Sequence, residues 1–168
     1  LSLENILLNK GPNGDLEVKL IDFGMSTTQR HSREIRGKQS YQAPEMHVKG
    51  KDYDGFLTDT FALGVALYCL VAQDYPWQST EPSGCQLFNF VSTKGFRAFL
   101  DRRKLRKGTN GERLSQVFTP NFTTMLEGLL CLTPAGRLTL GERYWSESLQ
   151  HAAKKSVWDM AWLDDWSA

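Results

Sequence analysis

The chain has 168 residues, of which 40% are hydrophobic and 23% charged, and its formal net charge is +1. These values are typical of a soluble globular protein and give no general support for binding to nucleic acid or to an anionic membrane. No apolar run reaches the length of about 18 residues that a membrane span needs, so we expect none. Three cysteines (Cys69, Cys85 and Cys131) lack metal-ligand spacing, and we expect a reduced, intracellular (cytoplasmic) location.

Two short strands, Asn5–Asn9 and Leu16–Ile21, are the first predicted elements, and a turn-rich stretch at 10–15 joins them. Apolar runs separated by Gly, Pro and Asn are typical of a β-hairpin, here with a buried end to the second strand. The hairpin brings Asn5 and Asp22 to the same end. Because Mg²⁺ prefers oxygen ligands, this carboxylate and this amide have the local geometry that a shared metal needs.

A polar loop and a long apolar helix follow. Residues 25–42 have no sustained period, and we expect a loop. Residues Thr58–Ala72 are apolar on nearly every face, which indicates a helix that is buried all round and capped by Thr58. We expect this helix to be the central pillar of a mainly α-helical domain.

The remainder of the chain predicts shorter helices. They are expected at 85–93, 121–131 and 140–153, with a turn at 133–136. Residues 97–113 are basic and are expected to be irregular; they lack interleaved aromatic residues, so no nucleic-acid partner is expected. Trp158, Trp162 and Trp166 share a four-residue spacing that would line one helical face packed against the domain.

Several short motifs occur in a fixed order. Asp22-Phe23-Gly24 follows the hairpin, Ala43-Pro44-Glu45 closes the polar loop, Asp59 begins Asp-Thr-Phe-Ala-Leu-Gly in the apolar helix, and Arg137 ends Thr-Pro-Ala-Gly-Arg. Asp-Phe-Gly alone is more often a strand that ends in a turn. The ordered series, in contrast, resembles the motif set of the eukaryotic protein kinases.

The resemblance implies that residues 1–153 form the C-terminal lobe of a protein kinase domain and that 154–168 form a Trp-rich tail. It implies a serine/threonine-type kinase that uses ATP and Mg²⁺ and acts on protein substrates. The family's catalytic Asp would immediately precede Leu1. We therefore expect this chain alone to be inactive. The alternatives are a pseudokinase or scaffold that binds partners without catalysis, which retention of both metal ligands argues against, and a fragment that is not functional. The oligomeric state is open.

The resemblance also assigns roles to single residues. Asp22 would bind the Mg²⁺ that bridges the β- and γ-phosphates, and Asn5 would bind the second ion. Leu7 and Ile21 would line the adenine pocket; the alternative is that both are ordinary strand-core positions. In either case we expect them to be buried. The remaining assignments are structural: Phe23 packed into the interior, Gly24 permitting a sharp turn, Asp59 accepting hydrogen bonds from the catalytic loop, and Glu45 in a buried ion pair with Arg137.

Two positions depart from the family pattern. Ser2 stands where serine/threonine kinases carry a Lys near the γ-phosphate, and Lys38 stands where they usually carry a Thr. We hypothesise a swap in which Lys38 supplies the missing ammonium from across the cleft. The alternative is that Lys38 is a solvated loop residue and that Ser2 marks degraded catalysis. Beside Asn5, Glu4 would face a basic residue of a substrate or remain a loop carboxylate without a specific partner.

Hydroxyl groups of the polar loop are candidate phosphorylation sites. A phosphate there could pair with the loop arginines Arg30, Arg33 and Arg36, and so order the loop. The alternative is that these arginines are solvated charges. The candidate sites are Ser26, Thr27, Thr28, Ser32 and Ser40.

Overall fold

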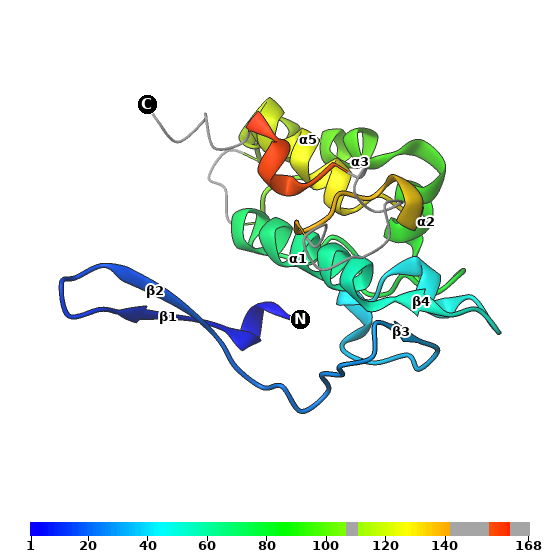
Figure 1. Cartoon of the computed structure of the whole chain (residues 1–168). Coiled ribbons are helices and arrows are strands. Elements are labelled where there is room, and N and C mark those ends of the chain that lie inside the picture. Colours follow the sequence, from blue (N-terminus) through cyan, green and yellow to red (C-terminus); the bar gives the residue numbers. More distant parts are fainter. Residues whose placement is uncertain (107–110, 142–154, 162–168) are drawn as a thin grey trace.

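The computed structural model describes residues 1–106, 111–141 and 155–161. This part of the chain is rich in helices and contains the predicted β-hairpin. It also contains a second small antiparallel sheet, β3–β4, that the sequence does not predict. Figure 1 shows α1 at the base of the helical body, with the other helices packed above it. The helices are α1 (Gly55–Ala72), α2 (Gln86–Lys94), α3 (Phe96–Arg102), α4 (Leu114–Val117) and α5 (Pro120–Leu129). The strands are β1 (Ile6–Lys10), β2 (Leu16–Leu20), β3 (His31–Ser32) and β4 (Tyr53–Asp54).

Helix α1 forms the centre of the hydrophobic core. Phe61, Val65 and Tyr68 are fully buried, which confirms the predicted central helix. At Gly64 the helix lies so close to the end of α5 that an added Cβ would be 2.8 Å from Leu130 Cδ2. Within the described residues, α1 is the one helix long and apolar enough to cross a membrane, but over half of it is buried inside the protein. A core helix of this kind meets the same criteria.

The predicted start of α1 is wrong. The helix begins at Gly55, because the Asp54 side chain accepts a hydrogen bond from the Phe56 amide at 3.0 Å. Asp is a favoured N-cap residue, since its carboxylate binds an amide that has no partner within the helix. Thr58, the expected cap, lies inside the first turn, where its hydroxyl donates to the Gly55 carbonyl at 2.9 Å.

The basic segment at 97–113 is also more ordered than its composition predicts. Helix α3 occupies its first part and buries Phe99 and Leu100 in the core, while Arg97 and Arg102 remain exposed. The pattern is hard to recognise because the helix has only seven residues and carries charges between its apolar positions. Arg103 then pairs with an acidic residue of the α1–α2 connection, Asp74, at 2.8 Å.

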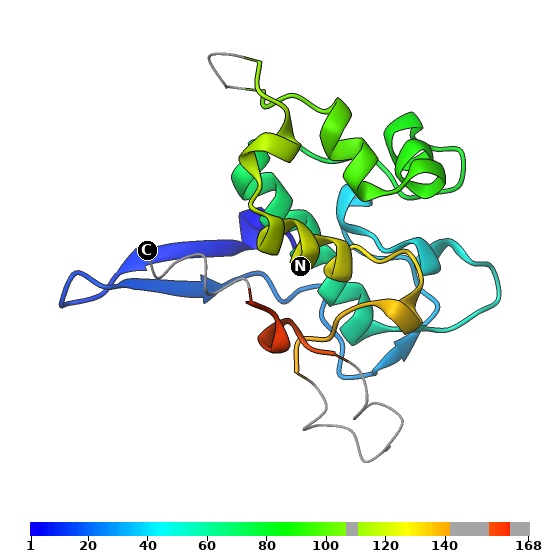
Figure 2. The ribbon, with the colours of Figure 1, turned by 90° about the horizontal axis from the view of Figure 1, so that it is seen from above.

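The hairpin is confirmed, with Ile6 opposite Leu20 in the register. Its predicted burial is wrong, because Leu8, Leu16 and Val18 each expose about two thirds of their surface. Figures 1 and 2 show the reason: the hairpin extends away from the helical body, and no other described segment covers it.

Most of the tail falls outside the described residues. Residues 142–153 of the helix expected at 140–153 lie outside the described residues. Trp162 and Trp166 lie outside them too, so the proposed tryptophan face stays a prediction. Trp158 is described; it is exposed, and its indole donates to the Leu140 carbonyl at 3.1 Å. It lies in a 3-10 turn, Val157–Asp159, whose Val157 is buried beside the end of α5.

Candidate active site

Asn5 and Asp22 lie at the same end of the β1–β2 hairpin. The Ile21 amide donates to the Asn5 carbonyl at 3.0 Å, which continues the ladder to the last residue before Asp22. Asp22 has a φ of 59°, a left-handed conformation that is uncommon for a residue other than glycine. Its Oδ1 accepts a hydrogen bond from the Gly24 amide at 3.3 Å. Backbone conformations of this kind cost energy and cluster at functional sites.

The apolar side chains around this end of the hairpin are exposed. Leu7 and Ile21 expose nearly half of their surface, and Phe23 exposes 66%. The expected burial of all three, and the packing of Phe23 into an interior, are therefore wrong for this chain. The physical reason is the projecting hairpin, which places these side chains beyond the reach of the helical body (Figure 1).

The polar loop is fastened to the start of α1. Strand β3 pairs with β4, with His31 opposite Asp54. Arg30 donates from Nε and Nη2 to Asp54 Oδ2 at 3.0 and 2.8 Å, and its guanidinium lies 5.0 Å from the centre of the Phe56 ring. Arg33 pairs with Asp52, and Arg36 with Glu34. Carboxylates thus already bind the arginines that were expected to be solvated or to receive a phosphate.

The candidate phosphorylation sites differ in exposure. Those at 26–28 are exposed, whereas Ser32 and Ser40 are partly buried. The Ser40 hydroxyl donates to the Gln78 carbonyl at 3.0 Å, and the Ser26 hydroxyl donates to the Phe23 carbonyl at 2.7 Å. Two other hydroxyl groups accept a backbone amide within the loop, those of Thr27 and Ser32. Modification of any of these residues stays a prediction.

Lys38 reaches across to the segment that carries Asn5. Its Nζ lies 2.7 Å from Glu4 Oε1, and the Tyr75 hydroxyl donates to the same oxygen at 3.2 Å. The hydrogen bond from Lys38 is the main reason that the pKa of Glu4 falls to about 2. Ser2, two residues before Glu4, is buried. Sequence reasoning missed Tyr75, because no local spacing links residues so far apart in the chain.

Arg137 and Glu45 form the buried ion pair that the sequence predicts. Their side chains meet through two hydrogen bonds, Nη1 to Oε1 at 2.5 Å and Nη2 to Oε2 at 2.9 Å. Arg137 also donates to the backbone carbonyls of Leu57, at 2.8 Å, and Cys131, at 2.9 Å. One side chain therefore ties the end of the polar loop to α1 and to the segment after α5. The hydrogen bonds that Asp59 is expected to accept from the catalytic loop stay a prediction.

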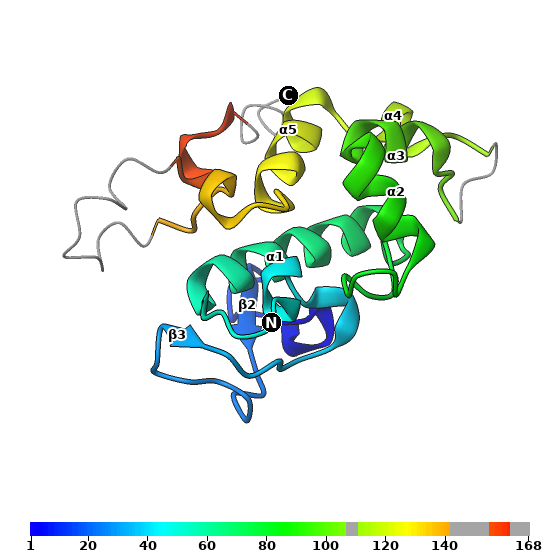
Figure 3. The ribbon, with the colours of Figure 1, turned by 90° about the vertical axis from the view of Figure 1, so that its right-hand side faces the viewer.

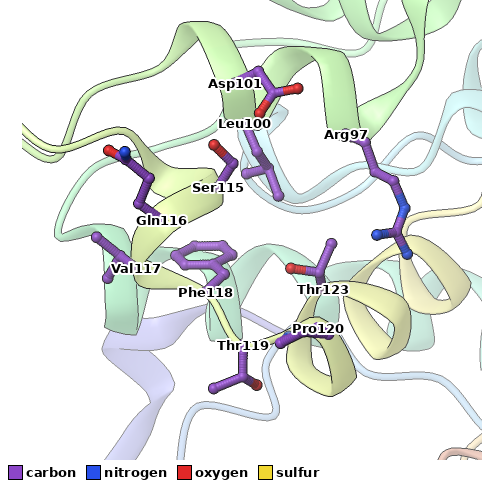
Figure 4. Close-up of a pocket in the computed structure, with 10 residues that line it drawn as sticks. All are labelled: Arg97, Leu100, Asp101, Ser115, Gln116, Val117, Phe118, Thr119, Pro120 and Thr123. Atoms are coloured by element: carbon purple, nitrogen blue, oxygen red, sulfur yellow. The ribbon is translucent and has the colours of Figure 1, made fainter.

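A pocket of about 480 Å³ lies elsewhere, between α3, α4 and the start of α5 (Figure 4). Leu100 and Phe118 are among its apolar lining residues, and Arg97 and Asp101 are its charged ones. None of the predicted site residues lines it. Within the described residues no three His, Cys, Asp or Glu side chains are grouped to hold a metal. The predicted Asn5–Asp22 site would be of a different kind, since it would use one carboxylate and one amide together with phosphate oxygens, and it stays a prediction.

Known proteins resemble this chain over most of its length. Residues 1–153 match the model of the protein kinase domain family. The serine/threonine-protein kinase kin-29 of Caenorhabditis elegans is 42% identical over 82 residues, which are 47% of this chain and 9% of that protein. The probable serine/threonine-protein kinase KKQ8 of Candida glabrata is 31% identical over 137 residues, 72% of this chain and 17% of that protein.

A plant protein matches a longer part of the chain. The CBL-interacting protein kinase 20 of Oryza sativa is 30% identical over 153 residues, which are 84% of this chain and 28% of that protein. The chain thus spans less than a third of the length of each of these three relatives.

Proposed function

Because the chain belongs to the protein kinase domain family, we propose that its protein transfers the γ-phosphoryl group of ATP to serine or threonine side chains of protein substrates. The observation that carries this proposal is the position of Asn5 and Asp22 at the same end of the hairpin. There the Ile21 amide donates to the Asn5 carbonyl, and Asp22 has a left-handed conformation. The names of the relatives support the choice of serine and threonine.

The chemistry assigned to Asn5 and Asp22 is metal binding. Mg²⁺ is commonly held by one or two carboxylates together with substrate phosphates and water, so a site with few protein ligands suffices. When bound, Mg²⁺ neutralises charge on the phosphates, and phosphoryl transfer depends mainly on such neutralisation and on positioning. Asp22 would hold one ion and Asn5 a second. Leu7 and Ile21 supply apolar surface for the adenine ring, and their exposure leaves that surface open.

Lys38 is proposed to supply the positive charge that position 2 lacks. Its ammonium forms an ion pair with Glu4, the residue that immediately precedes Asn5. Ser2 is small and buried, which leaves room for the lysine to lie over this segment. In the full-length protein, Lys38→Met should lower the turnover number; unchanged turnover would refute this role.

We further propose that this chain by itself transfers no phosphate. Leu7, Ile21 and Phe23 present an open apolar face, which we expect a further part of the protein to cover when the nucleotide site is complete. The location proposed for the protein is intracellular, where ATP is abundant and where the free thiols of Cys69, Cys85 and Cys131 would remain reduced.

The experiment is a transfer assay with radiolabelled ATP and Mg²⁺. Full-length protein is expected to label serine or threonine in a mixture of peptide substrates, and Asp22→Asn should reduce labelling by at least about a hundredfold, since it removes a carboxylate from the metal. The 168-residue chain should label nothing. Absence of labelling by the full-length protein, with retained fold, would contradict the proposal and favour the pseudokinase or scaffold alternative.

A further inference from the structure

The carboxylate of Glu4 is already satisfied within the chain. One of its oxygens, Oε1, receives hydrogen bonds from Lys38 Nζ at 2.7 Å and from the Tyr75 hydroxyl at 3.2 Å. Glu4 is therefore an anion whose partner comes from the chain itself.

The position of Glu4 is fixed from both sides. The neighbouring Leu3 amide donates to the Tyr41 hydroxyl at 3.1 Å, and the Tyr41 ring packs edge to face against Tyr75 at 5.8 Å. Tyr41 itself is buried. Two aromatic side chains thus hold the residues beside Asn5 against the segment that carries Lys38, so a peptide bound along that segment would pass Glu4.

The pair between Lys38 and Glu4 is reversible. The two side chains expose 55% and 50% of their surface, so solvent screens their attraction. Lys38 competes better for Glu4 than a cation in solution does, because the two residues belong to one chain. The chain keeps Lys38 near Glu4 at an effective concentration in the millimolar range. A basic side chain of a bound peptide would have to displace it.

We propose that Lys38 occupies the carboxylate that would otherwise bind a lysine or arginine of a peptide substrate. Through this contact the protein loses selectivity for a basic residue at that substrate position. Lys38 is then a specificity-determining residue, and Glu4 is the group whose availability it controls. This inference rests on the proposed function, because the ligand that would compete with Lys38 for Glu4 is a substrate peptide. The contact itself is tested by binding alone.

The test uses the 168-residue chain and pairs of fluorescent serine peptides that differ only by arginine or norleucine at one position, moved stepwise along the peptide. Wild type should bind the two members of every pair within about twofold of each other. Lys38→Met should prefer arginine at one position by about two- to fivefold, the strength of an exposed ion pair. Lys38→Gln, which keeps a polar side chain, should show the same preference. Adding Glu4→Gln to either variant should abolish it.

Lys49→Met is the matched control. It removes the same charge from an exposed lysine that forms no ion pair with Glu4 among the described residues, so it should leave the wild-type pattern unchanged. The proposal is overturned if wild type already prefers arginine, if neither Lys38 variant gains a preference, or if Lys49→Met gains the same one. Because no phosphate transfer is measured, a preference gained in the Lys38 variants stands even if the full-length protein proves inactive.

Discussion

The helical body buries its apolar side chains, whereas the β1–β2 hairpin exposes most of its own. In the body, Phe61, Val65 and Leu126 are fully buried. In the hairpin, Val18 exposes 65% of its surface, and its neighbours on both strands are similarly open. Figure 3 shows the helices stacked over α1, with the hairpin below and behind them. The two regions are joined through the polar loop and the contacts of Glu4.

Because of this difference, the two requirements of the proposed enzyme, a stable fold and a nucleotide site, fall in different regions of the chain. The helical body buries enough apolar surface to order itself, and it holds the polar loop through Arg137 and Arg30. The hairpin orders its backbone through the hydrogen bonds between its two strands but leaves its apolar side chains exposed. The stability of the fold therefore lies in the first region, and the proposed nucleotide site lies in the second.

The largest expected effect is the loss of the Arg137–Glu45 pair. Arg137→Met should lower the free energy of unfolding by about 3–5 kcal/mol, because it leaves the Glu45 carboxylate without its buried partner. Urea denaturation measures the change. The matched control is Arg97→Met, which breaks an exposed pair with Glu127 at 2.7 Å and should cost at most about 1 kcal/mol. Equal costs for the two variants would contradict the assigned role of Arg137.

A smaller effect is expected where α1 meets the end of α5. Gly64→Ala places a methyl group within 2.9 Å of Leu129 Cβ, and overpacking of this kind costs about 1–3 kcal/mol. Alanine also favours the helix by about 1 kcal/mol relative to glycine, so we expect a net loss near the low end of that range. Thermal unfolding measures it. An increase in melting temperature would show that the helices can separate at no cost.

The stability that the Lys38–Glu4 pair adds between the two regions should depend only weakly on pH. The pKa of Glu4 is depressed from 4.5 to about 2, so its stabilising pair is intact above about pH 4.5 and is lost as the pH falls through 2. Since the pair is half-exposed, the contribution to stability is at most about 1 kcal/mol. An NMR titration of the Glu4 carboxyl carbon should show this low pKa, and Lys38→Met should raise it toward 4.5. A pKa near 4.5 in the wild type would rule out the pair in solution.

The smallest effect is expected in the hairpin. Leu8→Ser and Val18→Thr should each change the free energy of unfolding by no more than about 0.5 kcal/mol, because exposed side chains make few contacts. Phe61→Ala, in contrast, should cost about 3–5 kcal/mol. If the hairpin variants cost as much as the core variant, the apolar face of the hairpin must be covered in solution.

The sequence predicts the hairpin, the central helix and the Glu45–Arg137 pair, because each depends on a local pattern or on an ordered motif. It fails for α3, whose short amphipathic stretch is hidden by its charges. The start of α1 was placed too late, because Asp54, and not the expected Thr58, binds a free amide of the first turn. Exposure of Phe23 could not be predicted either, since burial depends on which surfaces are present in three dimensions.

Contacts between distant residues were the least predictable part of the candidate site. Arg30 with Asp54 and Glu4 with Tyr75 connect positions that share no period or motif. The polar loop was therefore expected to present free arginines, whereas carboxylates near the start of α1 already bind two of them, Arg30 and Arg33.

The metal site proposed for Asn5 and Asp22, at the open end of the hairpin, is tested most directly by paramagnetic relaxation. Mn²⁺, which substitutes for Mg²⁺, is titrated into the labelled chain in the presence of ATP, and the broadening of each amide signal is measured. The account predicts selective broadening at Asn5 and Gly24, with little effect at Gly14, which lies in the turn at the opposite end of the hairpin. Equal broadening at both ends, or none at either, would contradict it.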